Sequence, residues 1–246
     1  MANEDSSIKR LLAARGEGNL WDNARFILAD VPLDPRESKR VLPCGLRPSD
    51  PPIATLFVSN YPKVSFTVPY REAAVLIHVR TPLGKGLHCC WMLVDDDTAL
   101  IYGRELLGYP KKMADITFEE KDDHISASVS RRGVKVLTME GKRGPAQNPP
   151  PPVFNHKTFN AGGPGQFFAF NPIWFFRPKE VVRESYSAEV KLTLADSDYD
   201  PIARLVSGEP LNGRIAVTDI LGSKYNLPVW LTGLIWFANV YNMRFR

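Results

Sequence analysis

The chain has 246 residues, of which 44% are hydrophobic and 24% charged, a balance typical of a folded globular protein rather than a disordered one. Its net charge of +4 comes from scattered Lys and Arg residues, so the sequence predicts no nucleic-acid partner. An odd count of three cysteines favours a reduced, cytoplasmic setting. The longest apolar stretch, 227–238, is shorter than the ~20 residues of a membrane-spanning helix, so it predicts a buried element and no membrane partner.

The first regular elements expected are one strand and one short helix. Residues 24–31 predict a strand. The segment DPRESKRVLP then predicts a helix of about two turns. Asp34 can accept hydrogen bonds as N-cap, Pro35 suits the first helical position, and Glu37 completes a capping box.

Short β-rich runs separated by Pro, Gly, Asn or Asp dominate from residue 54 onward. They predict strands over 54–60, 64–68, 73–79, 87–94, 98–102, 116–120, 124–130 and 134–140. The last two alternate apolar and polar residues around a turn that contains Gly133, which is typical of a hairpin with one buried face.

Residues 144–165 interrupt this pattern with four consecutive prolines, which predict a stiff extended segment. The segment could link two domains, but strand-like runs resume after it, which favours an excursion within one domain. These later runs lie at 166–170, 185–194 and 214–220. A second short helix is expected over 200–210, with Asp200 as its cap.

Many short strands and few helices predict a mainly β protein, either a barrel or a sandwich. We expect an N-terminal arm over 1–20 and a single domain over 21–246. His88, Cys89 and Cys90 lie within an apolar run without a second pair at ligand spacing, so we interpret them as core residues and expect no metal site.

The segment GRELLGYPKKMA places Lys111 and Lys112 among apolar residues. Adjacent lysines are more often a solvated surface pair, but an amine freed of its proton would be a nucleophile. Burial and a nearby positive charge both lower a lysine pKa from its usual ~10.4. Because neighbouring residues on a strand point to opposite faces, adjacency alone does not bring the two ammonium groups together.

This segment resembles the active-site signature of the acetoacetate decarboxylase family, and the early helix, PYREAAVLIHV and PLNGRIAVTDILGSKYNLP are similar to other family segments. The resemblance implies a cone-shaped β-barrel that forms homo-oligomers. It implies that Lys111 is the Schiff-base residue and that Lys112 lowers its pKa. It also implies that Glu72 handles protons and that Tyr109 lines the pocket.

Two family residues are not clearly present. A family acid about fifteen residues before Glu72 is replaced here by Phe57 or Val58. The family's arginine that orients the substrate carboxylate aligns with Ala24, one place from Arg25, which we take as the candidate substrate-binding residue.

The resemblance implies a lyase that decarboxylates a small β-keto acid, such as acetoacetate, through a lysine iminium and enamine, without a metal or organic cofactor. Aldol addition and dehydration of a keto acid by the same imine chemistry is the alternative. A non-catalytic protein that binds a small ligand is the third possibility.

Overall fold

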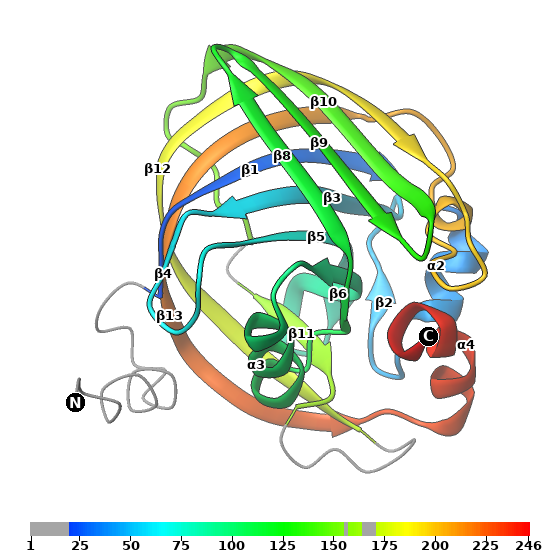
Figure 1. Ribbon diagram of the computed structural model, residues 1–246. Coiled ribbons are helices and arrows are strands. Elements are labelled where there is room, and N and C mark those ends of the chain that lie inside the picture. Colours follow the sequence, from blue (N-terminus) through cyan, green and yellow to red (C-terminus); the bar gives the residue numbers. More distant parts are fainter. Residues whose placement is uncertain (1–19, 155–156, 164–170) are drawn as a thin grey trace.

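The computed structural model describes residues 20–154, 157–163 and 171–246, and only the backbone of residues 224–226. Within this part, seven strands form a ring (Figure 1). In spatial order they are β11 (Thr158–Ala161), β6 (Gly84–Val94), β5 (Tyr70–Thr81), β3 (Ile53–Tyr61), β1 (Trp21–Pro32), β13 (Asn212–Leu231) and β12 (Pro172–Leu194). The ring closes because β11 pairs with β6 on one side and with β12 on the other.

Three further strands continue the sheet from β12 and arch over the outside of the ring (Figure 1). They are β10 (Val134–Ala146), β9 (His124–Arg131) and β8 (Asp115–Lys121). Short edge strands complete the sheet: β2 (Arg47–Pro48), β4 (Lys63–Val64) and β7 (Lys111–Met113).

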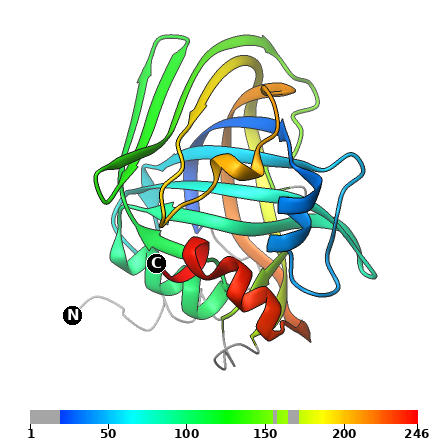
Figure 2. The same cartoon turned by 90° about the vertical axis from the view of Figure 1, so that its right-hand side faces the viewer.

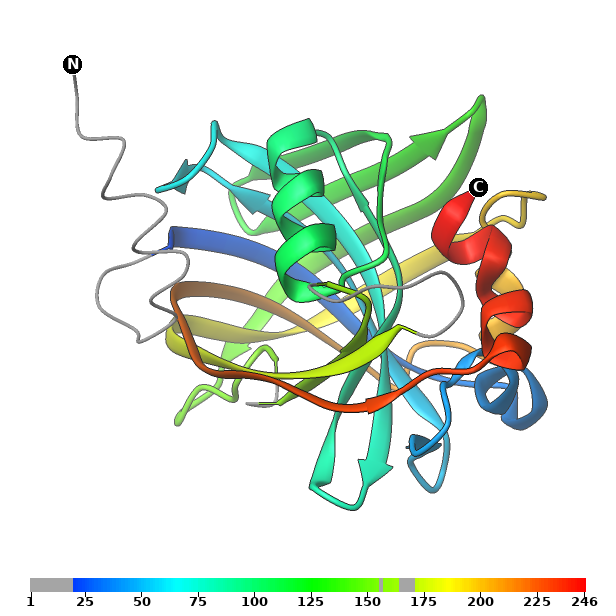
Figure 3. The ribbon, with the colours of Figure 1, turned by 90° about the horizontal axis from the view of Figure 1, so that it is seen from below.

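The helices pack outside the strands. They are α2 (Pro35–Val41), α3 (Asp97–Leu107), the 3-10 helix η1 (Ala203–Leu205) and α4 (Leu234–Phe245). Figure 2 shows α2 beside α4, and both α3 and α4 face the viewer in Figure 3. Within the described ranges, no helix combines the length and apolar character needed to cross a membrane.

Strand alternation divides the core into an inner and an outer cluster. On β1, Phe26 and Leu28 belong to the inner cluster, whereas Ile27 and Ala29 belong to the outer one. The outer cluster also contains buried residues of β9 and β10, so the arching strands cover the outer face of the ring. The inner cluster includes Tyr109, which places the lysine motif beside the interior of the ring.

The mainly β, single-domain fold class is confirmed, and the closed ring agrees with a cone-like barrel. The helix after β1 forms as predicted, with Asp34 Oδ1 accepting hydrogen bonds from the backbone of Arg36 and Glu37. Its capping box does not form: the Asp34 backbone N–H donates to the Leu205 carbonyl, and the Glu37 carboxylate binds Arg40. The predicted hairpin turns through Arg132 and Gly133, both with positive φ.

Three predicted elements are wrong. Residues 98–102 lie in α3, which begins where the Asp96 carboxylate accepts a hydrogen bond from Ala99 N and ends at Gly108 with φ 71°. In the predicted strand over 64–68, only Val64 is part of a strand, at the end of β4. Within 200–210, only η1 is helical, and the Asp200 carboxylate is buried among cations rather than capping a helix.

The apolar stretch 227–238 is not one buried element. It divides between the end of β13 and the start of α4. Ile235 is 82% exposed, whereas Trp236 is buried. The predicted strand over 166–170 lies outside the described residues.

Candidate active site

The lysine pair forms the start of β7, which runs parallel to β6 with Lys111 opposite Met92 and Lys112 opposite Leu93. The preceding helix α3 ends at Gly108, and the chain turns through Tyr109 before the strand begins. Because successive side chains of a strand point to opposite faces, Lys111 and Lys112 enter different environments.

Lys111 points into the interior and contacts Glu72 of β5. Its Nζ lies 2.7 Å from Glu72 Oε2, and both side chains are 6% exposed. The Tyr61 hydroxyl donates a hydrogen bond of 3.4 Å to the other carboxylate oxygen, Oε1. The Tyr70 ring lies beneath the ammonium, with 5.4 Å between Nζ and the ring centroid. An amine, a carboxylate and a phenol therefore meet in one buried place.

The aliphatic part of Lys111 packs against a glycine of α3. A Cβ added to Gly103 would lie 2.4 Å from Lys111 Cε and 2.5 Å from Cδ, so only glycine leaves this path open. The helix thereby fixes the direction in which the amine points.

A small cavity of about 40 Å³ lies over the amine. It is lined by Trp21, Tyr61, Tyr70, Glu72, Met92, Leu107, Tyr109, Lys111, Phe154, Phe176, Pro178 and Ile220. Glu72 and Lys111 are the two charged side chains of this lining, and the remainder is aromatic or aliphatic. The site suits chemistry that requires exclusion of water.

Burial shifts the titration of the phenols at this site. It raises the pKa of Tyr61 and of Tyr70 well above the ordinary value, and the nearby Glu72 charge adds to both shifts. Burial also raises the pKa of Tyr109. These phenols therefore keep their protons at neutral pH, so they are hydrogen-bond donors rather than bases.

Lys112 lies on the opposite face of β7 and is anchored there. Its Nζ donates hydrogen bonds to Asp200 Oδ1 at 2.6 Å, to the Tyr199 carbonyl at 3.0 Å and to the Asn242 carbonyl at 3.1 Å. Arg131 and Trp91 also donate to the Asp200 carboxylate. Burial lowers the pKa of Lys112 to about 8, although Asp200 opposes the shift.

This geometry corrects the role expected for Lys112. Its ammonium faces Asp200 and the backbone of α4, not the ammonium of Lys111. The expected electrostatic role of Lys112 assumed that the two ammonium groups face each other, and alternation along the strand prevents this. The contacts of Lys112 instead hold β7 in place.

Arg25 is the second correction. Its guanidinium pairs with Glu120 of β8, and its side chain is 40% exposed. Its neighbour Ala24 belongs to the inner cluster, as does Phe57, one of the two residues at the position of the family acid. Among the described residues that line the cavity over Lys111, there is no arginine, and Glu72 is the one carboxylate.

The other sequence candidates meet in one place, whereas most of the remaining lining residues, among them Tyr70, Tyr61 and Phe154, were not anticipated. Lys111, Glu72 and Tyr109 converge on one cavity. Tyr70 could have been found, because it precedes Glu72 by two residues and so shares its face. Prediction of Tyr61 as a lining residue would have required the register between β3 and β5. Prediction of Phe154 would have required the path of the Pro-rich segment. Within the described ranges, no group of three His, Cys, Asp or Glu side chains is arranged to hold a metal ion.

Comparison with known proteins identifies relatives of this chain. The family model for acetoacetate decarboxylase (ADC) matches residues 11–228. The chain belongs to the acetoacetate decarboxylase family. The curated acetoacetate decarboxylase of Burkholderia vietnamiensis is 29% identical over 113 residues, 46% of each chain, so the match spans about half the length of that relative.

Solved structures share the family fold at low sequence identity. One acetoacetate decarboxylase aligns with a TM-score of 0.76 and 19% identity over 93% of this chain and 98% of its own. The acetoacetate decarboxylase from Legionella pneumophila aligns with a TM-score of 0.72 and 16% identity, over 89% of this chain and 87% of its own. The enduracididine biosynthesis enzyme MppR, in complex with pyruvate, aligns with a TM-score of 0.71 and 14% identity, over 84% of this chain and 88% of its own.

Proposed function

We propose that this protein decarboxylates a small β-keto acid through an imine formed on Lys111. The observation that carries the proposal is the buried contact of 2.7 Å between Lys111 Nζ and Glu72 Oε2. It joins a nucleophile to a proton acceptor in a cavity otherwise lined by apolar and aromatic groups. Family membership supports lysine-imine chemistry, while the substrate is part of the proposal.

The first steps use the amine and the carboxylate together. Glu72 takes a proton from the Lys111 ammonium, and the neutral amine adds to the ketone carbonyl. Loss of the carbonyl oxygen as water leaves a protonated imine between Nζ and the former carbonyl carbon. Glu72 lies within reach of each of these protons because it already contacts Nζ.

Carbon dioxide leaves in the next step. The bond between the carboxylate carbon and the α-carbon breaks, and its electron pair flows into the iminium to give a neutral enamine. A cavity without water destabilises the charged carboxylate of the substrate and so favours its release as carbon dioxide. The enamine then takes a proton on carbon, and water hydrolyses the resulting iminium to the ketone and free Lys111.

Glu72 is suited to deliver the proton for this last stage, which the site takes up from solvent water. The Tyr61 hydroxyl donates to Glu72 Oε1, on the carboxylate oxygen that Lys111 does not contact. This hydrogen bond orients Glu72, while the raised pKa of Tyr61 keeps the phenol protonated. Proton delivery by Glu72 needs no acid at Phe57, where the chain has an aromatic ring.

The described residues that line the cavity include no arginine, which supports a second candidate function. Arg25, the candidate to orient a substrate carboxylate, pairs with Glu120 away from the cavity. An imine of a keto acid could then be deprotonated and add to an aldehyde, with loss of water, rather than release carbon dioxide. One structure of MppR contains the condensation product of pyruvate and imidazole 4-carboxaldehyde.

Reduction with sodium borohydride tests the imine itself. The protein is incubated with a panel of small keto acids and borohydride, and the secondary amine is mapped by mass spectrometry. We expect an adduct on Lys111 and none in Lys111→Ala. Absence of an adduct across the panel would reject both imine functions and favour the non-catalytic binding role.

Carbon dioxide release separates the two imine functions. Release from acetoacetate alone supports decarboxylation, whereas trapping without release, together with condensation when an aldehyde is added, supports the aldol function. The matched control is Arg25→Gln, which removes a cation that does not line the cavity.

Self-association into a homo-oligomer is also part of this proposal. Leu227, Leu231, Leu234 and Ile235 are each more than half exposed near the junction of β13 and α4, and burial against another subunit would remove this apolar surface from water. Light scattering coupled to gel filtration measures the assembly, and a monomeric mass would refute it.

A further inference from the structure

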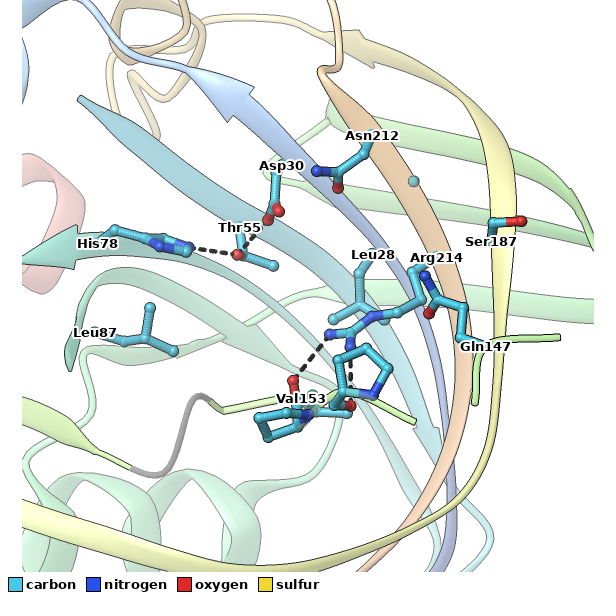
Figure 4. Close-up of a pocket in the computed structure, with 13 residues that line it drawn as sticks. Leu28, Asp30, Thr55, His78, Leu87, Gln147, Val153, Ser187, Asn212 and Arg214 are labelled. Carbon is cyan, nitrogen blue, oxygen red and sulfur yellow. Dashed lines mark hydrogen bonds between the residues drawn. The ribbon is translucent and has the colours of Figure 1, made fainter. Parts of the chain in front are cut away.

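A second cavity, of about 410 Å³, lies at another end of the same interior (Figure 4). Its lining includes Leu28, an inner-face residue of β1. It also includes His78 of β5, which lies six residues beyond Glu72 along that strand. Six residues of a strand span roughly 20 Å. The cavity is therefore distinct from the one over Lys111, with which it shares no lining residue.

The Pro-rich segment forms the wall between the two cavities. Val153 lines the second cavity and Phe154 lines the first. The backbone N–H groups of both residues donate to the Glu180 carboxylate, at 3.0 and 3.3 Å. Phe154 also packs edge-to-face against Phe26 and Phe57 of the inner cluster. An aromatic layer thus separates a polar compartment from the apolar one.

A row of polar side chains crosses adjacent strands in this compartment. Asp30 of β1 pairs in register with Asn212 of β13 and with Thr55 of β3. Thr55 Oγ1 donates to Asp30 Oδ1 at 2.5 Å and lies 2.8 Å from His78 Nε2. Since the Thr55 proton is directed to the carboxylate, His78 Nε2 carries a proton and donates it to Thr55. Burial lowers the pKa of His78, so its ring is neutral at pH 7.

Arg214 of β13 provides a positive charge beside the Asp30 carboxylate. Its guanidinium donates to the carbonyls of Pro151 and Pro152, at 3.0 and 3.2 Å, which uses two of its five N–H groups (Figure 4). Burial lowers the pKa of Arg214, and the nearby Asp30 and Glu180 charges oppose this shift.

The two charges lie on neighbouring strands of this lining. Leu28 pairs in register with Arg214, so Asp30 is its diagonal neighbour across β1 and β13. An α-amino acid carries an ammonium and a carboxylate on the same carbon, and so offers an opposite charge to each of the two side chains.

We infer that this cavity binds a free α-amino acid with an aliphatic side chain. The ammonium of the ligand binds the Asp30 carboxylate, and its carboxylate binds the remaining N–H groups of Arg214. Its side chain packs against Leu28, Leu87 and Val153, the apolar part of the lining. This site does not depend on imine chemistry at Lys111.

Calorimetric titration with L-leucine tests the inference, with 4-methylpentanoate and isopentylamine as ligands that each lack one charged group. We expect saturable binding of L-leucine and an affinity at least about tenfold lower for each half-ligand, since one hydrogen bond to a charged group contributes about 1.5–3 kcal/mol. Absence of saturable binding up to the solubility limit of L-leucine, or equal affinity for the half-ligands, would overturn it.

Substitutions locate the ligand. In Asp30→Asn, the affinity for L-leucine should fall about tenfold toward that of 4-methylpentanoate, whose own affinity should not change. Arg214→Gln should weaken both carboxylate ligands, and Lys111→Ala should bind L-leucine like the unmodified protein. Thermal unfolding checks that each variant is folded. An unaltered affinity in Asp30→Asn, or loss of binding in Lys111→Ala, would refute the assignment.

Discussion

Lys112 Nζ lies 2.6 Å from Asp200 Oδ1, on the face of β7 opposite the side chain of Lys111. The contact joins the strand that carries the candidate nucleophile to the segment before η1. Asp200 also binds Arg131, so one buried carboxylate holds two cations. The second lysine is therefore a positioning residue in this structure.

Removal of the Lys112 charge should destabilise the fold. Lys112→Met breaks a buried ion pair and should lower the free energy of unfolding by about 3 kcal/mol, as measured by urea denaturation. Lys63→Met is a matched control, because Lys63 pairs with Asp22 at the surface and should cost less than about 1 kcal/mol. The pH profile of imine trapping on Lys111 should keep its midpoint in Lys112→Met, and a shifted midpoint would contradict the positioning role.

Glu72→Gln should slow the reaction. The amide cannot accept the Lys111 proton, so we expect kcat to fall by roughly 10²- to 10⁴-fold. Arg25→Gln should leave kcat and KM unchanged, because its guanidinium pairs with Glu120 outside the cavity. A large rise of KM in Arg25→Gln would show that this arginine reaches the substrate after all.

Tyr61→Phe should test how far the hydroxyl of Tyr61 orients Glu72. The phenylalanine keeps the stacked ring but removes the hydroxyl that donates to Glu72, so borohydride trapping should persist while kcat falls at least about tenfold. Tyr70→Phe serves as control, since the Tyr70 hydroxyl accepts a hydrogen bond from Trp21. Equal losses in the two variants would indicate packing rather than orientation of Glu72.

Gly103→Ala should displace the Lys111 amine. The new methyl group occupies the path of Cδ and Cε, so the flexible side chain must move away from Glu72. We expect the rate of imine trapping to fall at least tenfold, by loss of positioning, in a variant that thermal unfolding shows to be folded. Gly233→Ala is the control because a Cβ there meets no atom within 4 Å, and its trapping rate should be normal.

The stability of the protein should fall in mild acid because of His88. Burial lowers the pKa of this ring to about 4, from 6.5, and its Nδ1 contacts the Phe159 carbonyl at 2.7 Å. Between these two pH values the unfolded chain binds the proton and the folded chain does not. Stability is therefore lost as pH falls from about 6.5 to about 4, by roughly 3 kcal/mol.

Urea unfolding at pH 7 and pH 4.5 measures this effect. In His88→Gln the group no longer titrates, so the difference in unfolding free energy between the two pH values should shrink. An unchanged difference would assign the acid sensitivity to other groups.

The sequence predicted the mainly β class and the meeting of Lys111 with Glu72. Alternating strands, turn residues and one specific segment were sufficient for both. It mispredicted residues 98–102 because a short apolar run suits a helix as well as a strand. Here the N-cap Asp96 and the C-cap Gly108, in the left-handed backbone conformation, stabilise the helix.

The site residues that escaped prediction depend on contacts between distant segments. The direction of Lys112 is fixed by Asp200, 88 residues away along the chain. Arg25 faces outward because its strand register places Ala24 inside. Neither fact follows from local pattern, since a shift of one residue in register reverses both faces.

The chain between Pro151 and Phe154 has a consequence for protein engineering. One short stretch of backbone contributes Val153 to one cavity and Phe154 to the other. The backbone N–H groups of these two residues donate hydrogen bonds to the Glu180 carboxylate. Libraries randomised at position 154 alone would reshape the reactive chamber, and libraries at 153 alone would reshape its neighbour. Two specificities could thus be evolved separately from adjacent codons.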